Sequence, residues 1–295
     1  MVVNVTCGVP QGSVVGPLLW NMRYDRVLRI QLPREVRLVG FADDTLVMVW
    51  GKTSDEVEAT ANSALDAVAA EIAALDLTLA TEKTEAVMFK RKYKDVVPRL
   101  VLSQTQVTMK RSIKHLGIIV DDNLNFNEHV DTVARKAQKV MQALGRLMPN
   151  VGGPKESKRK LLASVVHSVI LYGAPIWGPS LEYSRQRTDK LLTVQRRAML
   201  RCICAYKTTS RVAVNIIVAT PPIYLLAKER TDAYWSKKNA GTTPSRSAIR
   251  SVSIRRPREN IVPPDPTAKW TWMLWQICMQ DPEGDQQRMP SLWDS

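Results

Sequence analysis

The chain has 295 residues, of which 45% are hydrophobic, and a formal net charge of +14. This composition excludes a disordered chain, and the length allows two domains with buried cores. No run reaches the roughly 18 apolar residues that a membrane span requires, and the first residues lack a signal-peptide pattern, so we expect an intracellular protein without a membrane partner.

The positive charge is concentrated in one part of the sequence. Residues 1–122 contain fifteen Lys or Arg and fifteen Asp or Glu, whereas residues 132–211 contain sixteen bases and three acids. A basic block of this kind favours a polyanion partner, with binding that weakens as salt rises; a solubilising surface is the alternative. Candidate contacts to a nucleic-acid backbone are Arg135, Lys136, Lys139, Lys158, Arg159 and Lys160.

The cysteines do not indicate a metal or disulfide framework. Cys7, Cys202, Cys204 and Cys278 lack the spacing of zinc ligands and are too few for a disulfide-rich scaffold. We expect free thiols in a reducing compartment.

The first element in chain order is a loop, residues 8–13, followed by a helix. Apolar residues between positions 15 and 30 recur at helical spacing, and Pro33 ends the helix. Gly8 and Gly12 let the backbone approach another molecule closely, and the side-chain amide of Gln11 can bond to it. A plain surface amide is the alternative for Gln11.

Two adjacent carboxylates, Asp43 and Asp44, lie between two apolar runs in residues 36–50. This pattern predicts a tight hairpin with acids at its tip. Asp-Asp is a poor turn sequence if shape alone matters, because Asn-Gly or Asp-Gly supplies the positive φ that such turns need. Since like charges repel, we expect a cation beside them, and two hard oxygen ligands suit Mg²⁺. A solvated turn is the alternative.

The loop and the hairpin together resemble the reverse transcriptases of non-LTR (LINE-like) retrotransposons. Pro10-Gln11-Gly12-Ser13 before a helix, and Phe41-Ala42-Asp43-Asp44 on a hairpin, are similar in order and spacing to the second and third palm motifs of that family. Residues 14–21 resemble the version found in animal elements. The resemblance covers about residues 5–235. Viral RNA polymerases are a weaker alternative, because they usually have Gly before the Asp pair.

The resemblance implies roles for both motifs. Asp43 and Asp44 would be catalytic and would share two Mg²⁺ ions in the complete enzyme. The loop residues would line the nucleotide and template site: Gly8, Pro10, Gln11, Gly12 and Ser13.

The next segments are predicted to be a long helix and a short strand pair. Residues 53–75 show helical spacing with a capping box formed by Thr53 and Glu56. Within residues 77–89, Lys83-Thr84-Glu85 resembles a family motif in which an Asn usually precedes the lysine; Ala80-Thr81 stands there instead. In related polymerases such a lysine can protonate the pyrophosphate, so Lys83 is a candidate general acid. A solvated loop lysine is the alternative.

Residues 113–120 predict a strand. His115-Leu116-Gly117 resembles the primer grip of the family, where an aromatic residue usually precedes Leu-Gly; a half-buried structural role is favoured for His115. Asp121-Asp122 is predicted to form a turn before a helix cap at Asn125 or Asn127.

The rest of the chain is predicted to be mostly helical. Helices are expected at 126–148, 155–172, 181–204 and 223–235, in the place where the family has its thumb. Residues 241–267 have the composition of a flexible linker. Trp270, Trp272 and Trp275 then lie on a helix-like stretch, which docks on a core or stacks on bases.

We therefore predict an α+β protein with a partial right-hand polymerase palm, an antiparallel sheet with packed helices, followed by a mostly helical thumb and extension. The predicted divisions are 1–122 palm, 123–240 basic helical thumb, 241–267 linker and 268–295 Trp-rich segment. The predicted function is RNA-directed DNA polymerase, with an RNA template, a DNA primer duplex and a dNTP as partners, in the nucleus or cytoplasm as a ribonucleoprotein.

The fingers and the first catalytic Asp of the family are expected upstream of the loop, and only seven residues precede Gly8. We therefore expect this chain alone to be inactive. The alternative is a non-catalytic basic protein that binds RNA or DNA. The sequence leaves the oligomeric state open.

Overall fold

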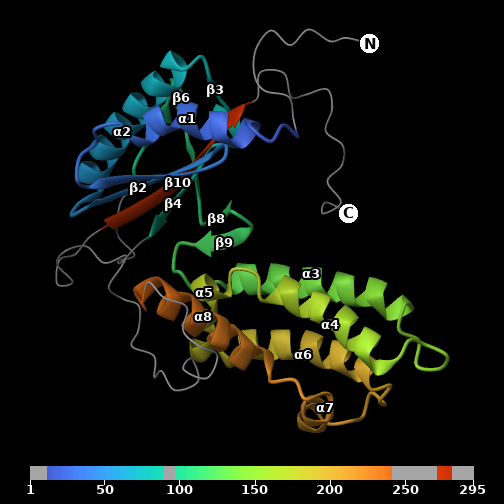
Figure 1. Ribbon diagram of the computed structural model, residues 1–295. Helices are drawn as coiled ribbons and strands as arrows, with labels where there is room; N and C mark the ends of the chain where they lie inside the picture. Colours follow the sequence, from blue (N-terminus) through green and yellow to red (C-terminus); the bar gives the residue numbers. More distant parts are fainter. Residues whose placement is uncertain (1–11, 90–96, 241–270, 281–295) are drawn as a thin grey trace. The chain divides into compact units, whose positions relative to one another are not determined.

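The computed structural model describes residues 12–89, 97–240 and 271–280, which divide into two compact units (Figure 1). The first unit contains the described residues up to His115, residues Asp121–Asn123 and a strand near the C-terminus. The second contains Leu116–Val120 and the described residues from Leu124 to the last helix. The chain combines helices and strands, as predicted. It crosses between the units after residues 115, 120 and 123, and it returns to the first unit after the last helix.

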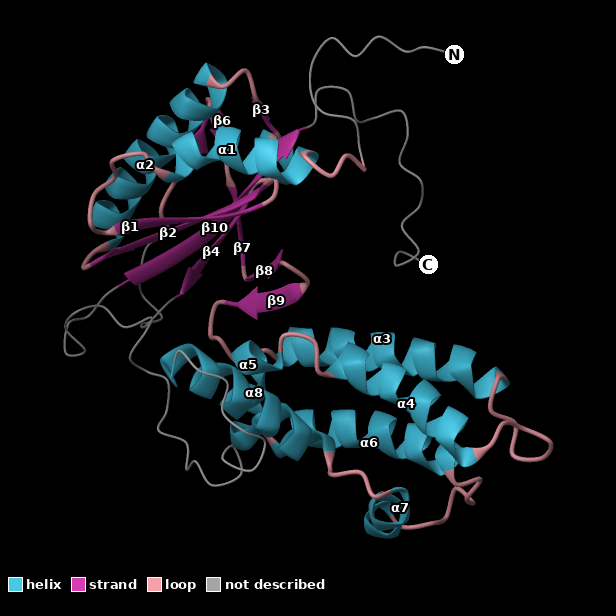
Figure 2. Ribbon diagram, in the orientation of Figure 1, coloured by secondary structure: helices cyan, strands magenta, loops and turns pink. Residues whose placement is uncertain are grey.

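The first unit is built on a twisted sheet with the strand order β1-β2-β10-β4-β7 (Figure 2). The bounds are β1 Val36–Phe41, β2 Asp44–Gly51, β4 Glu85–Phe89, β7 Thr108–Lys110 and β10 Thr271–Gln280. β1 pairs antiparallel with β2, and β4 pairs parallel with β7. The short strand β3, Thr78–Leu79, pairs with the end of β10. The hairpin predicted for residues 36–50 is therefore confirmed.

Two helices cover one face of this sheet, α1 (Gly16–Leu28) and α2 (Ser54–Ala74) (Figure 1). The apolar stripe of α2, from Val57 to Ile72, is buried against Tyr24 and Val27 of α1 and against the valines of β2. The side chain of Thr53 accepts a hydrogen bond from the Glu56 amide, as the capping box predicts. The carboxylate of Glu56 in turn accepts from the Lys52 amide, 2.9 Å away.

The C-terminal segment differs from its prediction as a helix-like stretch. Residues Thr271–Gln280 form strand β10, which pairs antiparallel with β2 on one side and with β4 on the other. A short apolar run cannot be assigned to helix or strand by its periodicity alone. The adjacent strands determine the conformation of this segment, because the backbone groups along the edges of β2 and β4 need a partner strand.

The strand predicted for residues 113–120 is interrupted. It consists of β8 (Ser112–His115) and β9 (Ile118–Asp121), with a turn at Leu116 and Gly117, whose φ values are 46° and 82°. Positive φ at both turn residues is the geometry of a tight hairpin connection and ends a strand. The small strands β5 (Val101–Leu102) and β6 (Thr105–Gln106) pair with each other in the first unit.

The second unit is a bundle of helices. Its elements are α3 Asn127–Arg146, α4 Glu156–Ile170, α5 Ala174–Trp177, the 3-10 helix Gly178–Tyr183, α6 Arg185–Cys202, α7 Arg211–Val218 and α8 Ile223–Ala240. Four of these agree with the predicted helices, and α7 was not predicted. The residue in the N-cap position of α3 is Phe126, not Asn125 or Asn127 as predicted, and it forms no side-chain cap. The side chain of Asn125 accepts a hydrogen bond from the Asn127 amide at 2.9 Å. Trp177 is fully buried in the core that these helices share.

Among the described residues, no single helix is long and apolar enough to cross a membrane. Two sharply bent helix pairs reach that length and composition when each pair is taken together, Glu156–Ile170 with Ala174–Tyr183 and Arg211–Val218 with Ile223–Asn239.

Candidate active site

The two carboxylates predicted to hold a metal lie at the tip of the β1–β2 hairpin. Phe41 pairs with Asp44, so Ala42 and Asp43 are the two residues of the turn. Asp43 is exposed, and Asp44 is half-buried at the start of β2. Ala42 has a φ of 53°, in the left-handed region. The acids are therefore carried by a short turn that is fixed on both sides by the strand ladder.

Helix α1 lies beside this turn. The indole N–H of Trp20, one helical turn after the start of α1, donates to the carbonyl oxygen of Ala42 at 2.9 Å. The residues just before α1 are Gly12, with a φ of 85°, and Ser13, whose hydroxyl accepts from the Val15 amide at 3.3 Å. The start of α1 and the acid turn are thus neighbours in the first unit. Gly8, Pro10 and Gln11 lie outside the described residues.

Strand β10 brings the Lys83 segment to the same end of the sheet as the acids. Asp44 pairs with Cys278, and Glu85, two residues after Lys83, pairs with Gln276 on the opposite edge of β10. Both β2 and β4 begin at this end with one strand between them, and their first residues are offset by two positions along the sheet. Two strand spacings across and two residues along separate these starts by about 12 Å. This role of residues 271–280 is not evident from the sequence, where the segment resembles a helix.

Lys83 is exposed on a single turn of 3-10 helix, Thr81–Lys83. The next residue anchors this turn, since Thr84 is 2% exposed and its hydroxyl donates to the carbonyl of Ala80 at 3.2 Å. Glu85 forms an ion pair with Lys110. Ala80 stands near the position where reverse transcriptases usually have Asn. It helps to fix the turn before Glu85 through its main-chain carbonyl, which accepts the hydrogen bond from Thr84.

The residues predicted as a primer grip lie at the turn between β8 and β9. His115 is half-buried, as expected for a structural histidine, and Leu116 is exposed. The hydroxyl of Tyr172 donates to the carbonyl of Leu116 at 2.8 Å, and its ring would lie 3.2 Å from a Cβ placed on Gly117. Within the second unit, Tyr172 thus fixes the Leu116–Gly117 turn.

Most of the predicted nucleic-acid contacts are available on the surface of the second unit. Arg135, Lys136, Lys139 and Lys158 are exposed, and Lys160 is exposed with its Nζ 2.7 Å from Glu156.

Arg159 is the exception, and its prediction as a backbone contact is wrong. It is 3% exposed and donates to the main-chain carbonyls of Met148, Pro149, Pro154 and Arg201. Its guanidinium is therefore used inside the bundle, where it satisfies the carbonyls of helix ends and loops.

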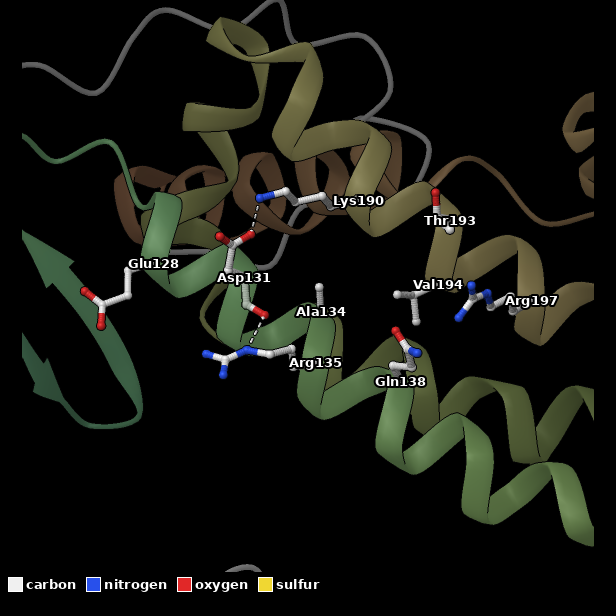
Figure 3. Close-up of a pocket in the computed structure, with 9 residues that line it drawn as sticks. All are labelled: Glu128, Asp131, Ala134, Arg135, Gln138, Lys190, Thr193, Val194 and Arg197. Atoms are coloured by element: carbon white, nitrogen blue, oxygen red, sulfur yellow. Dashed lines mark hydrogen bonds and ion pairs between the residues drawn. The ribbon is translucent and has the colours of Figure 1, made fainter.

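A hollow of about 720 Å³ lies between α3 and α6 of the second unit (Figure 3). Arg135 and Gln138 line it from α3, while Lys190, Thr193 and Arg197 line it from α6. Lys190 forms an ion pair with Asp131, and Glu128 also lines the hollow, so it is only weakly cationic. Lys190 and Arg197 were not singled out in the sequence, although their spacing of seven residues places them on one helix face.

The donor set at the acid turn fits a hard divalent cation, because both side chains offer carboxylate oxygens. Over the described part of the chain, however, no three His, Cys, Asp or Glu side chains come together in a way that could hold a metal ion. Asp43 and Asp44 would therefore supply two protein ligands between them.

Comparison with known families agrees with the loop and the hairpin. Residues 2–120 match the family described as Reverse transcriptase (RNA-dependent DNA polymerase). The matched region includes the acid turn, α1 and the Lys83 segment. Its family has a polymerase palm fold and generally uses a divalent metal.

Relatives extend the similarity beyond the matched region. The chain is 29% identical over 228 residues to the putative 115 kDa protein in type-1 retrotransposable element R1DM of Drosophila melanogaster, which covers 77% of this chain and 22% of that protein. It is 28% identical over 237 residues to a retrovirus-related Pol polyprotein from type-1 retrotransposable element R1 2 of Nasonia vitripennis, which covers 78% of this chain and 58% of that protein.

A third relative is the probable RNA-directed DNA polymerase from transposon BS of Drosophila melanogaster, 27% identical over 202 residues, which are 66% of this chain and 22% of that protein. These relatives confirm the predicted resemblance to reverse transcriptases of non-LTR retrotransposons. The chain spans 22% of the first relative's length and 58% of the second's. No solved structure matches the chain at a significant level.

Proposed function

We propose that this chain carries a catalytic carboxylate pair of an RNA-directed DNA polymerase from a non-LTR retrotransposon, in a partial palm formed by the first unit. The observation that carries the proposal is the position of Asp43 in the two-residue turn and of Asp44 at the first position of β2, beside α1 and within a region that matches the reverse transcriptase family. The hairpin presents both carboxylates on one rigid support, which a phosphoryl-transfer site requires.

In this proposal the reaction is nucleotidyl transfer. The primer 3′-hydroxyl attacks the α-phosphate of a dNTP, the new phosphodiester bond forms, and pyrophosphate leaves. Asp43 and Asp44 would hold two Mg²⁺ ions together with other ligands. When bound, these ions stabilise the charge that develops on the transferring phosphoryl group.

The chain's own residues have separate tasks around this centre. Lys83, exposed at the same end of the sheet, would donate a proton from Nζ to the departing pyrophosphate. The loop before α1, with Gly12 and Ser13 at its described end, would contact the incoming nucleotide and the template. Leu116 and Gly117, which Tyr172 holds in a tight turn, would contact the primer.

The second unit would act as a basic thumb that holds the duplex by its backbone. The exposed bases of α3 support this role, because Arg135, Lys136 and Lys139 lie within five residues of one another on a helix. Contacts of this kind carry no sequence information and depend strongly on salt.

A second candidate function is binding of RNA or DNA without catalysis. It is favoured by one observation: the part of the chain that the structure describes brings only two carboxylates together at the hairpin, whereas a two-metal site usually needs more ligands. The basic helices alone would suffice for this function.

The two candidates are separated by measuring duplex binding and labelled dNTP incorporation on an RNA template with a DNA primer. We compare wild-type protein with Asp43→Asn/Asp44→Asn. The matched control is Asp121→Asn/Asp122→Asn, which changes the other Asp-Asp pair of the first unit. We expect salt-sensitive duplex binding by all three proteins. The sequence alone predicts an inactive chain, whereas the proposed acid pair predicts slow incorporation by wild type and by the control variant, which Asp43→Asn/Asp44→Asn abolishes.

Incorporation that persists in Asp43→Asn/Asp44→Asn would overturn the assignment of the catalytic pair. A wild-type protein that neither binds the duplex nor incorporates dNTP would overturn the proposed function as a whole. Tight, salt-sensitive binding with no incorporation by wild-type protein would favour the second candidate.

A further inference from the structure

The turn that carries the acid pair has an unfavourable backbone conformation. Ala42 has a φ of 53°, a region that residues with a Cβ avoid and that the first position of a two-residue hairpin loop usually gives to glycine. A conformation of this kind persists only where the surrounding structure holds it. The residues that hold Ala42 therefore control the arrangement of the two carboxylates that follow.

Trp20 holds the residue before the acid pair. Its indole N–H donates to the carbonyl oxygen of Ala42 at 2.9 Å, so the hydrogen bond acts on the peptide unit that joins Ala42 to Asp43. The Trp20 ring stacks on the ring of Tyr24, with centroids 5.6 Å apart and planes within 10° of parallel. The two aromatic residues are four positions apart in α1 and thus lie on one helix face.

Tyr24 holds the residue after the acid pair. Its hydroxyl is hydrogen-bonded to the hydroxyl of Thr45, which is fully buried at the second position of β2. Tyr24 itself is 3% exposed. Asp43 and Asp44 therefore lie between two residues, Ala42 and Thr45, that are each bonded to a different aromatic side chain of α1.

Gly40 allows α1 to come this close to the hairpin. A Cβ at Gly40 would lie 3.1 Å from Cε1 of Tyr24 and 3.1 Å from Cδ2 of Leu28. Both distances are tighter than ordinary van der Waals contact, so a larger residue would displace the Tyr24 ring. Glycine at position 40 therefore permits the close packing of α1 on β1.

We propose that Trp20 and Tyr24 are positioning residues for the carboxylates of Asp43 and Asp44, bonded to the residues on either side of the pair and holding it in the arrangement that binds divalent cations. This inference rests on the proposed function of the acid pair. Two adjacent carboxylates repel each other, so a turn that is fixed in advance spares the ligand pair the cost of ordering when the cation arrives.

The electrostatics of Tyr24 agree with this placement. Burial raises the pKa of the Tyr24 phenol, the hydrogen bond to Thr45 opposes that change, and the negative charge of Asp43 raises the pKa further. The phenol therefore keeps its proton at neutral pH and remains a neutral partner of Thr45. A charged phenolate beside the acid pair would add to its repulsion.

The test removes each hydrogen bond while keeping the ring. Trp20→Phe lacks the indole N–H, and Tyr24→Phe lacks the hydroxyl. Trp50→Phe is the matched control, because it makes the same chemical change at the far end of the same strand, β2. We measure amide hydrogen exchange in residues 42–45, Mn²⁺ affinity by electron paramagnetic resonance, and the melting temperature, for these variants, wild type and Asp43→Asn/Asp44→Asn.

We expect Trp20→Phe to speed exchange at the turn by about tenfold, as for the loss of one hydrogen bond, and to weaken Mn²⁺ binding by about tenfold. Tyr24→Phe should give a smaller effect in the same direction, and Trp50→Phe should change neither quantity. Unchanged exchange in Trp20→Phe would overturn the proposal, and so would faster exchange without weaker Mn²⁺ binding. If wild type and Asp43→Asn/Asp44→Asn bind Mn²⁺ equally, the proposed function of the acid pair is refuted. The exchange data then still show whether Trp20 and Tyr24 hold the turn.

Discussion

The guanidinium of Arg159, on α4, lies 2.9 Å from the carbonyl oxygen of Arg201 in the last turn of α6. The same side chain donates through Nε to the carbonyl of Pro154 at 2.7 Å, and it is almost fully buried. Carbonyls at helix C-termini and in loops have no partner within their own helix. Arg159 therefore joins two helices and a loop of the second unit through their main chains.

We predict that Arg159→Ala destabilises the second unit by about 2–4 kcal/mol, because several buried carbonyls would lose their donor. Urea denaturation measures the change in the free energy of unfolding. Lys158→Ala is the control, since the neighbouring Lys158 is exposed and its loss should change stability by less than about 0.5 kcal/mol. Weaker duplex binding by Arg159→Ala at unchanged stability would instead restore the role that the sequence first indicated.

His129 should make the second unit sensitive to acid. It is 1% exposed, burial lowers its pKa from 6.5 to about 4, and its Nδ1 accepts a hydrogen bond from the Ile119 amide at 3.2 Å. Between these two pH values the unfolded chain binds a proton that the folded chain does not. The contribution of neutral His129 to the free energy of unfolding is therefore fully present above pH 6.5. It is lost as the pH drops toward 4, which lowers the free energy of unfolding by about 3 kcal/mol.

This prediction is checked by urea denaturation of wild type and His129→Asn across that pH range. The Asn side chain can still accept a hydrogen bond from the Ile119 amide but cannot gain a proton. The variant should be less stable at neutral pH, because a smaller side chain fills the site, yet its stability should depend less on pH. Equal pH dependence in the two proteins would show that another group is responsible.

Strand β10 should be required for the first unit to fold. Removing residues 268–295 would leave the edges of β2 and β4 without a partner, since β10 pairs with both. We expect this truncation to lose cooperative unfolding or to aggregate, as unpaired strand edges do. Removing only residues 281–295 keeps β10 and should preserve a cooperative melt. A stable, monomeric 1–267 protein in gel filtration and thermal denaturation would contradict the pairing.

Local patterns predicted the parts of the fold that local physics determines. The β1–β2 hairpin follows from two apolar runs around Asp43 and Asp44, and the start of α2 follows from the side chain of Thr53. The four long helices of the second unit follow from their periodicity and from the Pro and Gly residues between them. The candidate acid pair was found for the same reason, because its chemistry is visible in adjacent residues.

The features that depend on distant partners were not predicted. Residues 271–280 become a strand because β2 and β4, more than 180 positions earlier, need a neighbour. The sequence does not distinguish Arg159 from an exposed basic residue. The carbonyls to which it donates come together only when the helices of the second unit pack. In the sequence, Trp20 is one of several apolar residues of a predicted helix. Its hydrogen bond to the carbonyl oxygen of Ala42, 22 positions later, is visible only in the structure.

The central claim is that Asp43 and Asp44 form a divalent-cation site, and a Mn²⁺ titration followed by electron paramagnetic resonance tests it most directly. Wild-type protein, Asp43→Asn/Asp44→Asn and Asp121→Asn/Asp122→Asn are compared under the same conditions. We predict that wild type and the Asp121/Asp122 variant bind Mn²⁺ alike, and that the Asp43/Asp44 variant loses this binding. Equal Mn²⁺ affinity in all three proteins would contradict the claim.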